Sequence, residues 1–185
     1  MKKDSSYYRN LIAVVIANSE ADTWENAVHE WIIHDVEEDA NLEESCVCGK
    51  EELKYLFTIK NRLNQKVLFP LGSRCIKRFE RSDLNEEVAI KEKLFKLLHA
   101  VNNNDFLTLS SNLFSRKLLD YLFDVGAFKP TSYNFYRPSN DLDFMIQMFN
   151  RRKPMTPAQE RKTVAILLNS IKPFLQTELM GKIRK

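Results

Sequence analysis

Three cysteines are the residues best suited to chemistry in this chain of 185 residues. Cys46 and Cys48 are one residue apart and are followed by Gly49, whose conformational freedom lets both thiols face one ion. Cys75 is expected in the first turn of a helix, where free backbone amides favour the thiolate, the form of cysteine that binds metals. Because structural zinc sites use cysteine and histidine ligands, this pattern predicts a bound Zn²⁺.

The fourth zinc ligand is open, since a structural site has four and the chain has only three cysteines. His34 is the first candidate, because it lies on a neighbouring predicted strand, and His29 is the second. His99 lies in a leucine-rich segment and is expected to be packed there. A water molecule or a partner group is a further alternative, which would suit a catalytic site better. The cysteines could also be three buried thiols without a metal, because free cysteine is among the most buried residue types.

A β-hairpin is expected between the two cysteine positions. Residues 53–60 alternate apolar and polar side chains, which is typical of a half-buried strand, and residues 66–69 read as its return partner. Pro70 is expected to end this second strand, because proline cannot donate to a ladder. Ser73 is expected to cap the short helix that carries Cys75. Knuckle, hairpin and helix in this order form a treble-clef arrangement.

Helical periodicity dominates the rest of the chain. Residues 5–18 predict an amphipathic helix, residues 31–36 a strand, and the 3.6-residue period holds from Ser82 onward. The last helix has the clearest start, because Thr156, Pro157 and Gln159 form a capping box with proline at the first position. Pro173 is expected to kink it.

These elements predict an α+β fold, in which a small treble-clef-like zinc module packs on a mainly α-helical body. We expect N-terminal helices over residues 1–29, the zinc-knuckle β-hairpin module over 30–81 and a helical domain over 82–185.

Charge is distributed unevenly. Residues 1–44 carry three basic and 11 acidic side chains, a net charge of −8, whereas residues 45–185 carry 25 basic and 14 acidic ones, a net charge of +11. Such a division predicts either separate binding faces or an acidic segment lying against a basic body, unless the charges are only solvated surface.

The cysteine count and the absence of targeting patterns indicate the compartment. An odd number of cysteines, two of them one residue apart, argues against a disulfide framework and for a reducing compartment. The sequence shows no secretory signal, and no stretch reaches the roughly 20 apolar residues of a membrane span. We therefore expect a cytoplasmic protein without a membrane partner.

Clusters of basic residues are the candidates for nucleic-acid binding, because phosphates attract lysine and arginine. The candidates are Arg74, Lys77, Arg78 and Arg81 around the short helix, and Arg151, Arg152 and Lys153 before the last helix. Lys182, Arg184 and Lys185 add cations at the end of the chain, and Tyr133, Phe135 and Tyr136 could stack on unpaired bases. The same cations could instead be solubilising charges at helix ends.

Catalysis has little support in the sequence. No Ser-His-Asp spacing, phosphate loop or metalloprotease motif is present. Cys75 could act as a nucleophile with His34 as its base, but a structural thiolate explains the same residues with fewer assumptions.

The cysteine segment resembles a group of small, mostly uncharacterised proteins from bacteriophages and mobile elements. The shared features are Glu30-Trp31, Cys46-Val47-Cys48-Gly49, Ile59-Lys60-Asn61, Gly72-Ser73-Arg74-Cys75-Ile76 and Phe79. The resemblance covers residues 30–80 and implies a zinc-binding module in a phage or bacterial cytoplasmic protein, with no established activity. Some members carry a histidine just after the knuckle glycine, where this sequence has Lys50.

Taken together, these features favour a non-catalytic, zinc-stabilised phage or mobile-element protein that binds nucleic acid or a nucleoprotein complex. The alternative is an anti-defence inhibitor that binds a host nuclease, such as a CRISPR effector, with the acidic N-terminal segment mimicking nucleic acid. An enzyme that uses Cys75 or an open zinc position is the third hypothesis.

Overall fold

The computed structural model describes residues 5–103 and 109–184, which form an α+β protein with one mixed, four-stranded sheet. They divide into two compact units. The sheet unit comprises residues 5–91 and 182–184, and the helical unit comprises residues 92–103 and 109–181. The described parts of the predicted segments 1–29 and 30–81 therefore belong to the same unit. None of the described helices combines the length and apolar character needed to cross a membrane.

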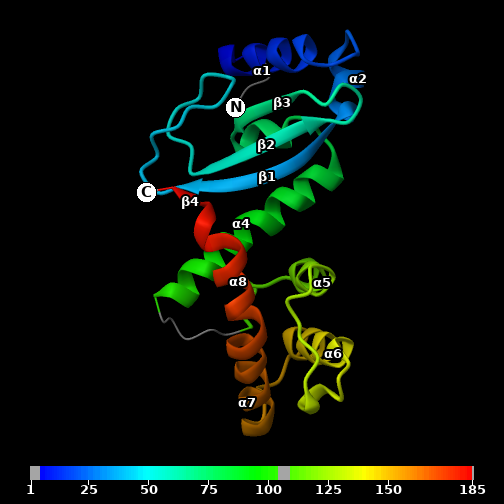
Figure 1. Ribbon diagram of the computed structural model, residues 1–185, viewed down its shortest axis with the longest axis vertical. Coiled ribbons are helices and arrows are strands. Elements are labelled where there is room, and N and C mark those ends of the chain that lie inside the picture. Colours follow the sequence, from blue (N-terminus) through cyan, green and yellow to red (C-terminus); the bar gives the residue numbers. More distant parts are fainter. Residues whose placement is uncertain (1–4, 104–108, 185) are drawn as a thin grey trace. The chain divides into compact units, whose positions relative to one another are not determined.

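The sheet has the strand order β3-β2-β1-β4 (Figure 1). Antiparallel pairing joins β1 (Trp31–Asp39) to β2 (Tyr55–Asn61) and β2 to β3 (Val67–Leu71), and the short β4 (Ile183–Arg184) joins β1 in parallel. The strand and the hairpin expected from the sequence are confirmed. Strand β4 was not predicted, because its two residues are too few to show an alternating pattern.

The prediction that Pro70 ends the second hairpin strand is wrong, because β3 continues through Pro70 to Leu71. The strand tolerates proline because β3 lies at the edge of the sheet, where a missing N–H leaves no neighbour unpaired. The carbonyl of Pro70 accepts the N–H of Val47 at 2.9 Å, which ties the cysteine loop to this edge.

Helices complete the sheet unit: α1 (Ser6–Ala17), α2 (Trp24–Ala27), η1 (Val28–Glu30), α3 (Ser73–Lys77) and the start of α4 (Ser82–Asn102). The helix expected over residues 5–18 is α1, which is capped by Ser5, whose side chain accepts the N–H of Tyr8. The core comprises side chains that are at most 1% exposed, among them Leu11, Val15, Trp31, Phe57, Ile59 and Ile76. Each contributes roughly 1.5–3 kcal/mol through burial.

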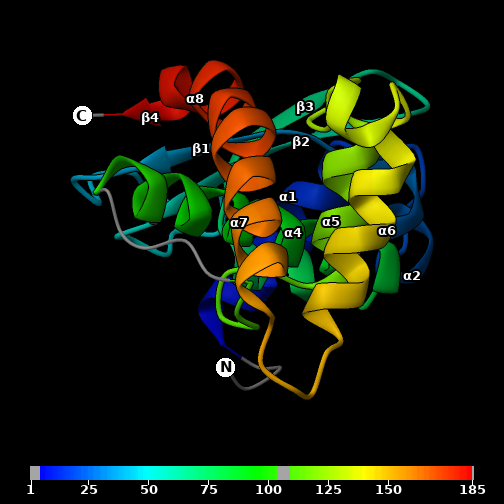
Figure 2. The same ribbon diagram turned by 90° about the horizontal axis from the view of Figure 1, so that it is seen from below.

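The helical unit contains the rest of α4 and the elements α5 (Arg116–Asp124), η2 (Ser132–Asn134), α6 (Pro138–Phe149), α7 (Pro157–Ile166), η3 (Leu167–Ile171), α8 (Lys172–Leu179) and part of η4 (Met180–Lys182). The capping box predicted at Thr156 and Gln159 is confirmed. Figure 2 shows α7 leading directly into α8. Between them η3 is a π-helical turn that ends just before Pro173, which lacks the N–H that an α-helix would use there.

Candidate metal centre

The loop that carries Cys46 and Cys48 is a tight turn immediately before the hairpin. Gly49 closes it with a φ of +91°, a backbone conformation that favours glycine, and its N–H donates to the carbonyl of Cys46 at 2.7 Å. The N–H of Cys46 donates to the carbonyl of Lys50 at 2.8 Å. These bonds turn the backbone within residues 46–50 and direct both cysteines to the same side.

Cys75 reaches the same place from the other end of the hairpin. It is the third residue of α3, so its predicted position in the first helical turn is confirmed, although the helix is capped by Gly72 rather than by Ser73. The N–H of Gly72 points at the sulfur of Cys46 at 3.5 Å. A Cβ at position 72 would lie 2.9 Å from Leu53 Cδ2, so a larger residue there would require the Leu53 side chain to shift.

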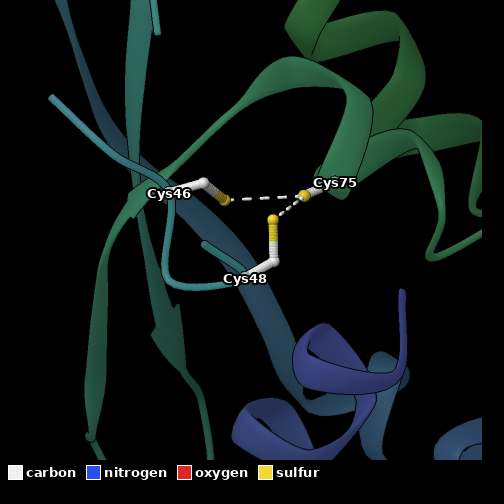
Figure 3. Close-up of side chains that lie close together, drawn as sticks. All are labelled: Cys46, Cys48 and Cys75. Atoms are coloured by element: carbon white, nitrogen blue, oxygen red, sulfur yellow. Dashed lines mark hydrogen bonds between the residues drawn. The ribbon is translucent and has the colours of Figure 1, made fainter. Parts of the chain in front are cut away.

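The three sulfur atoms converge on one point (Figure 3). Cys75 Sγ lies 3.5 Å from Cys46 Sγ and 3.3 Å from Cys48 Sγ, and all three atoms lie within 4.8 Å of one another. Thiolates on a tetrahedral zinc ion at about 2.3 Å would be separated by about 3.8 Å. The two separations from Cys75 Sγ are therefore within about half an ångström of the spacing that a shared ion requires.

The three cysteines are buried, which affects the pKa values of their thiols. Cys46, Cys48 and Cys75 are 4%, 0% and 6% exposed. A hydrogen bond with Cys75 lowers the pKa of Cys46 to about 6, whereas burial raises the pKa of Cys48, and the hydrogen bond with Cys46 together with burial raises that of Cys75. One thiolate is thus favoured beside two thiols. A cation at the centre is what would let all three ionise, because like charges at this distance repel one another.

The predicted fourth ligand does not join the cluster. In the described part of the chain, the metal-ligating group at this place consists of the three cysteines and includes no histidine. His34 lies on β1 with an exposed side chain, at a register shift where the ladder passes from Ile33 to Asp35. His29 is also exposed, and His99 is half-buried in α4.

Asp39 positions the cysteine loop, a role that the sequence reasoning missed. Its two carboxylate oxygens accept four backbone N–H groups, from Asn41, Leu42, Glu43 and Glu44, at 2.8–3.1 Å. Burial alone would raise the pKa of Asp39, but these four hydrogen bonds outweigh it and lower the pKa. An aspartate in the acidic loop that follows the predicted strand, with Asn41 two residues later, was the available signal for such a turn.

Glu30 and Asn61, two residues of the segment that resembles the phage proteins, form a buried hydrogen bond. Glu30 and Asn61 are 7% and 0% exposed, and Asn61 Nδ2 donates to Glu30 Oε2. The Glu30 carboxylate also accepts the N–H groups of Glu20 at 2.9 Å and Ala21 at 2.7 Å. Next to it, the indole N–H of Trp31 donates to Ser19 Oγ at 2.9 Å. This network fixes the segment before β1 to the end of β2.

The four cations predicted around α3 differ in their surroundings. Arg74 and Lys77 are exposed on the helix, whereas Arg78 is half-buried with its guanidinium 5.4 Å from the centre of the Tyr8 ring. The guanidinium of Arg81 donates to the carbonyls of Val28 and Trp31 at 2.9 and 2.6 Å and pairs with Asp83. Arg81 is thus a structural residue within the sheet unit.

The second predicted cluster lies in the helical unit, between α6 and α7. The guanidinium of Arg151 donates to the carbonyls of Lys153 and Pro154 in its own loop, and Arg152 and Lys153 are exposed. At the end of the chain, Lys182 pairs with Asp35, and Arg184 pairs with Glu37 and Glu44; Lys185 lies outside the described residues. The uneven charge distribution predicted either separate binding faces or an acidic segment lying against basic residues. These ion pairs show the second arrangement for part of the acidic segment.

Comparison with known proteins adds no family: no protein-family model, no curated protein and no solved structure matches the chain.

Proposed function

We propose that this protein is a non-catalytic, zinc-stabilised nucleic-acid-binding protein, in which Cys46, Cys48 and Cys75 hold the metal in a treble-clef-like module. The observation that carries the metal is the convergence of three buried sulfurs from a tight turn and a helix start. Thiolates are soft ligands that suit zinc, and zinc would supply the positive charge that lets all three ionise. A water molecule or another small donor would complete the four positions, and the burial of the three sulfurs is what favours a structural role despite this non-protein ligand.

The role of the metal is structural in this proposal. Its ligands come from the loop before the hairpin and from α3 after it, so a bound ion would clamp both ends of the hairpin. The three sulfurs are almost wholly inaccessible, and the cluster, among described residues, includes no histidine or carboxylate that could serve as a general base. Both features suit a scaffold better than a reaction centre.

The surface that the metal would position is the exposed side of α3. Arg74 and Lys77 flank Cys75 on a helix of five residues, so the metal would fix their position directly. Cations held on a rigid helix are what phosphate binding requires, and the chain from residue 45 onward has an excess of basic residues. The expected setting is the reducing interior of a bacterial cell that carries the phage or mobile element, where the thiols stay available as ligands.

Mimicry of nucleic acid by the acidic segment, the alternative function, needs carboxylates that are open to a partner. Several of them are occupied within the sheet unit: Glu30 and Asp39 accept backbone N–H groups, Glu38 pairs with Lys54, and Asp35 pairs with Lys182. We therefore favour the basic surface over the acidic one.

Charge reversal on α3 tests the nucleic-acid proposal. The double variant Arg74→Glu/Lys77→Glu should weaken binding to both DNA and RNA at low salt, measured by fluorescence anisotropy with the full chain. Lys66→Glu, at an exposed lysine beside the hairpin turn of the same unit, is the control and should have a smaller effect. Unchanged affinity in the double variant would refute a role for this surface.

A further inference from the structure

The loop before α6 in the helical unit exposes three large aromatic side chains within four residues. Tyr133, Phe135 and Tyr136 are 90%, 79% and 72% exposed. Aromatic side chains usually bury most of their surface. Single exposed apolar residues are common, but a contiguous group of them is typical of a binding surface. We call residues 129–137 the aromatic loop.

Asn134 holds this loop rigidly from inside. Its side chain is 1% exposed; the amide oxygen accepts the N–H of Thr131, and the amide nitrogen donates to the carbonyl of Lys129 and to Asp141. Its carbonyl accepts the side chain of Asn140 at 2.9 Å. The loop is therefore preorganised, and its aromatic rings are displayed without the cost of ordering a flexible segment on binding.

The backbone of the aromatic loop is strained at two of the three aromatic positions. Phe135 and Tyr136 have φ values of 56° and 57°, a left-handed conformation that bulky side chains rarely adopt. Such strain lowers the stability of the fold and is concentrated at functional sites. Folding alone would be better served by asparagine or glycine at these positions.

Charge indicates what the rings contact. Exposed Lys129 and Arg137 flank the aromatic residues, and residues 129–137 include no acidic side chain.

Tyr133 also lines a cavity of about 480 Å³, whose rim carries the exposed Arg161. Among the described residues that line this cavity, the one carboxylate is that of Asp141, which is paired with Lys162 at 3.6 Å and bonded to Asn134, so it opposes an anionic ligand little.

We propose that the aromatic loop is a stacking platform for the unpaired bases of single-stranded nucleic acid. Tyr133, Phe135 and Tyr136 stack on successive bases, and Lys129, Arg137 and Arg161 attract the phosphates between them. Stacking of this kind is tolerant of sequence, because every base has an aromatic face. The inference rests on the proposed nucleic-acid-binding function and specifies its substrate as single-stranded.

The positive φ values of Phe135 and Tyr136 allow a variant that removes both rings without an expected loss of stability. The double variant Phe135→Asn/Tyr136→Asn removes two rings but places residues that tolerate a positive φ, so its melting temperature should equal or exceed that of the wild type. Leu63→Ser, which removes a 66% exposed apolar side chain from the hairpin turn of the sheet unit, is the control. Fluorescence anisotropy at low salt should compare labelled oligothymidylate and oligouridylate of about 20 nucleotides with a duplex of the same length.

The wild type should bind both single strands more tightly than the duplex. The double variant should bind the single strands more weakly, by roughly 5- to 150-fold for each stacking base lost, and Leu63→Ser should bind as the wild type does.

If the wild type binds single strands and the double variant binds them equally well, the aromatic loop is not the platform, although the proposed function stands. If the wild type binds no nucleic acid, both proposals are wrong. If the variant instead dissolves a dimer of the wild type and leaves nucleic-acid affinity unchanged, the loop is a protein contact and the inference is overturned.

Discussion

Replacing Glu30 by glutamine should destabilise the sheet unit far more than the loss of one charge suggests. The carboxylate accepts three hydrogen bonds: Oε1 from the N–H of Ala21, and Oε2 from the N–H of Glu20 and the side chain of Asn61. A glutamine amide has only one acceptor atom, so in its better orientation it keeps two bonds and turns its own NH₂ toward a donor.

The magnitude follows from these bonds. Hydrogen bonds to a charged acceptor contribute about 1.5–3 kcal/mol each and neutral ones about 0.5–1.5 kcal/mol, while relief of the buried charge offsets part of the loss. We expect Glu30→Gln to lower the free energy of unfolding by about 2–4 kcal/mol at neutral pH. Glu20→Gln neutralises an exposed carboxylate in the same region and should cost less than about 0.5 kcal/mol.

The dependence on pH gives a second readout. Burial alone would raise the pKa of Glu30, but the bonds from Asn61 and the two backbone N–H groups outweigh it and lower the pKa below its ordinary value of 4.5. A carboxyl group whose pKa is lowered on folding stabilises the protein fully above its unfolded pKa and loses this effect as the pH falls through the folded pKa. The difference between wild type and variant should therefore be constant near neutrality and shrink in acid.

Urea unfolding followed by tryptophan fluorescence is the appropriate assay, because both tryptophans, Trp24 and Trp31, lie in the sheet unit. A loss below about 0.5 kcal/mol, or a difference that grows as the pH falls, would refute the role assigned to Glu30.

Three further predictions concern the cysteine module and its surface. Gly49→Ala should lower the free energy of unfolding by about 1–3 kcal/mol in the same assay, because alanine is strained at a φ of +91°; an unchanged stability would contradict this. Cys75→Ser should lower the melting temperature of metal-loaded protein and remove its sensitivity to a chelator, whereas a variant that still responds to chelation would place the metal elsewhere. Arg74→Glu should weaken binding to all nucleic-acid sequences alike and reduce the salt dependence of binding, unlike Lys66→Glu, and a loss confined to one sequence would argue against a phosphate contact.

The sequence predicted those features of the cysteine module that depend on local patterns. The alternation over residues 53–60 requires a strand with one apolar face, and the return strand follows from the short polar connection between them. Cys75 falls in the first turn of α3 because Gly72 provides the turn after the hairpin and an apolar helical pattern begins there.

The positions that were missed depend on contacts distant in the sequence. His34 lies on the predicted strand, but the register shift after Ile33 arises from pairing with β2, which a local pattern does not reveal. Arg81 was predicted to be one more surface cation, yet it donates to the carbonyls of Val28 and Trp31, which lie 53 and 50 residues earlier in the chain. Strand β3 passes through Pro70 because it is an edge strand, which only the sheet order determines.

Metal analysis of the full chain, purified under reducing conditions, is the most direct test of the zinc site. We expect about one zinc ion per chain. Replacement by Co²⁺ should give the absorption of a tetrahedral site with thiolate ligands, and Cys48→Ser should change that absorption. A chain that folds with the same stability in the presence and absence of a chelator, and that contains no zinc, would contradict the account and leave Cys46, Cys48 and Cys75 as three buried thiols.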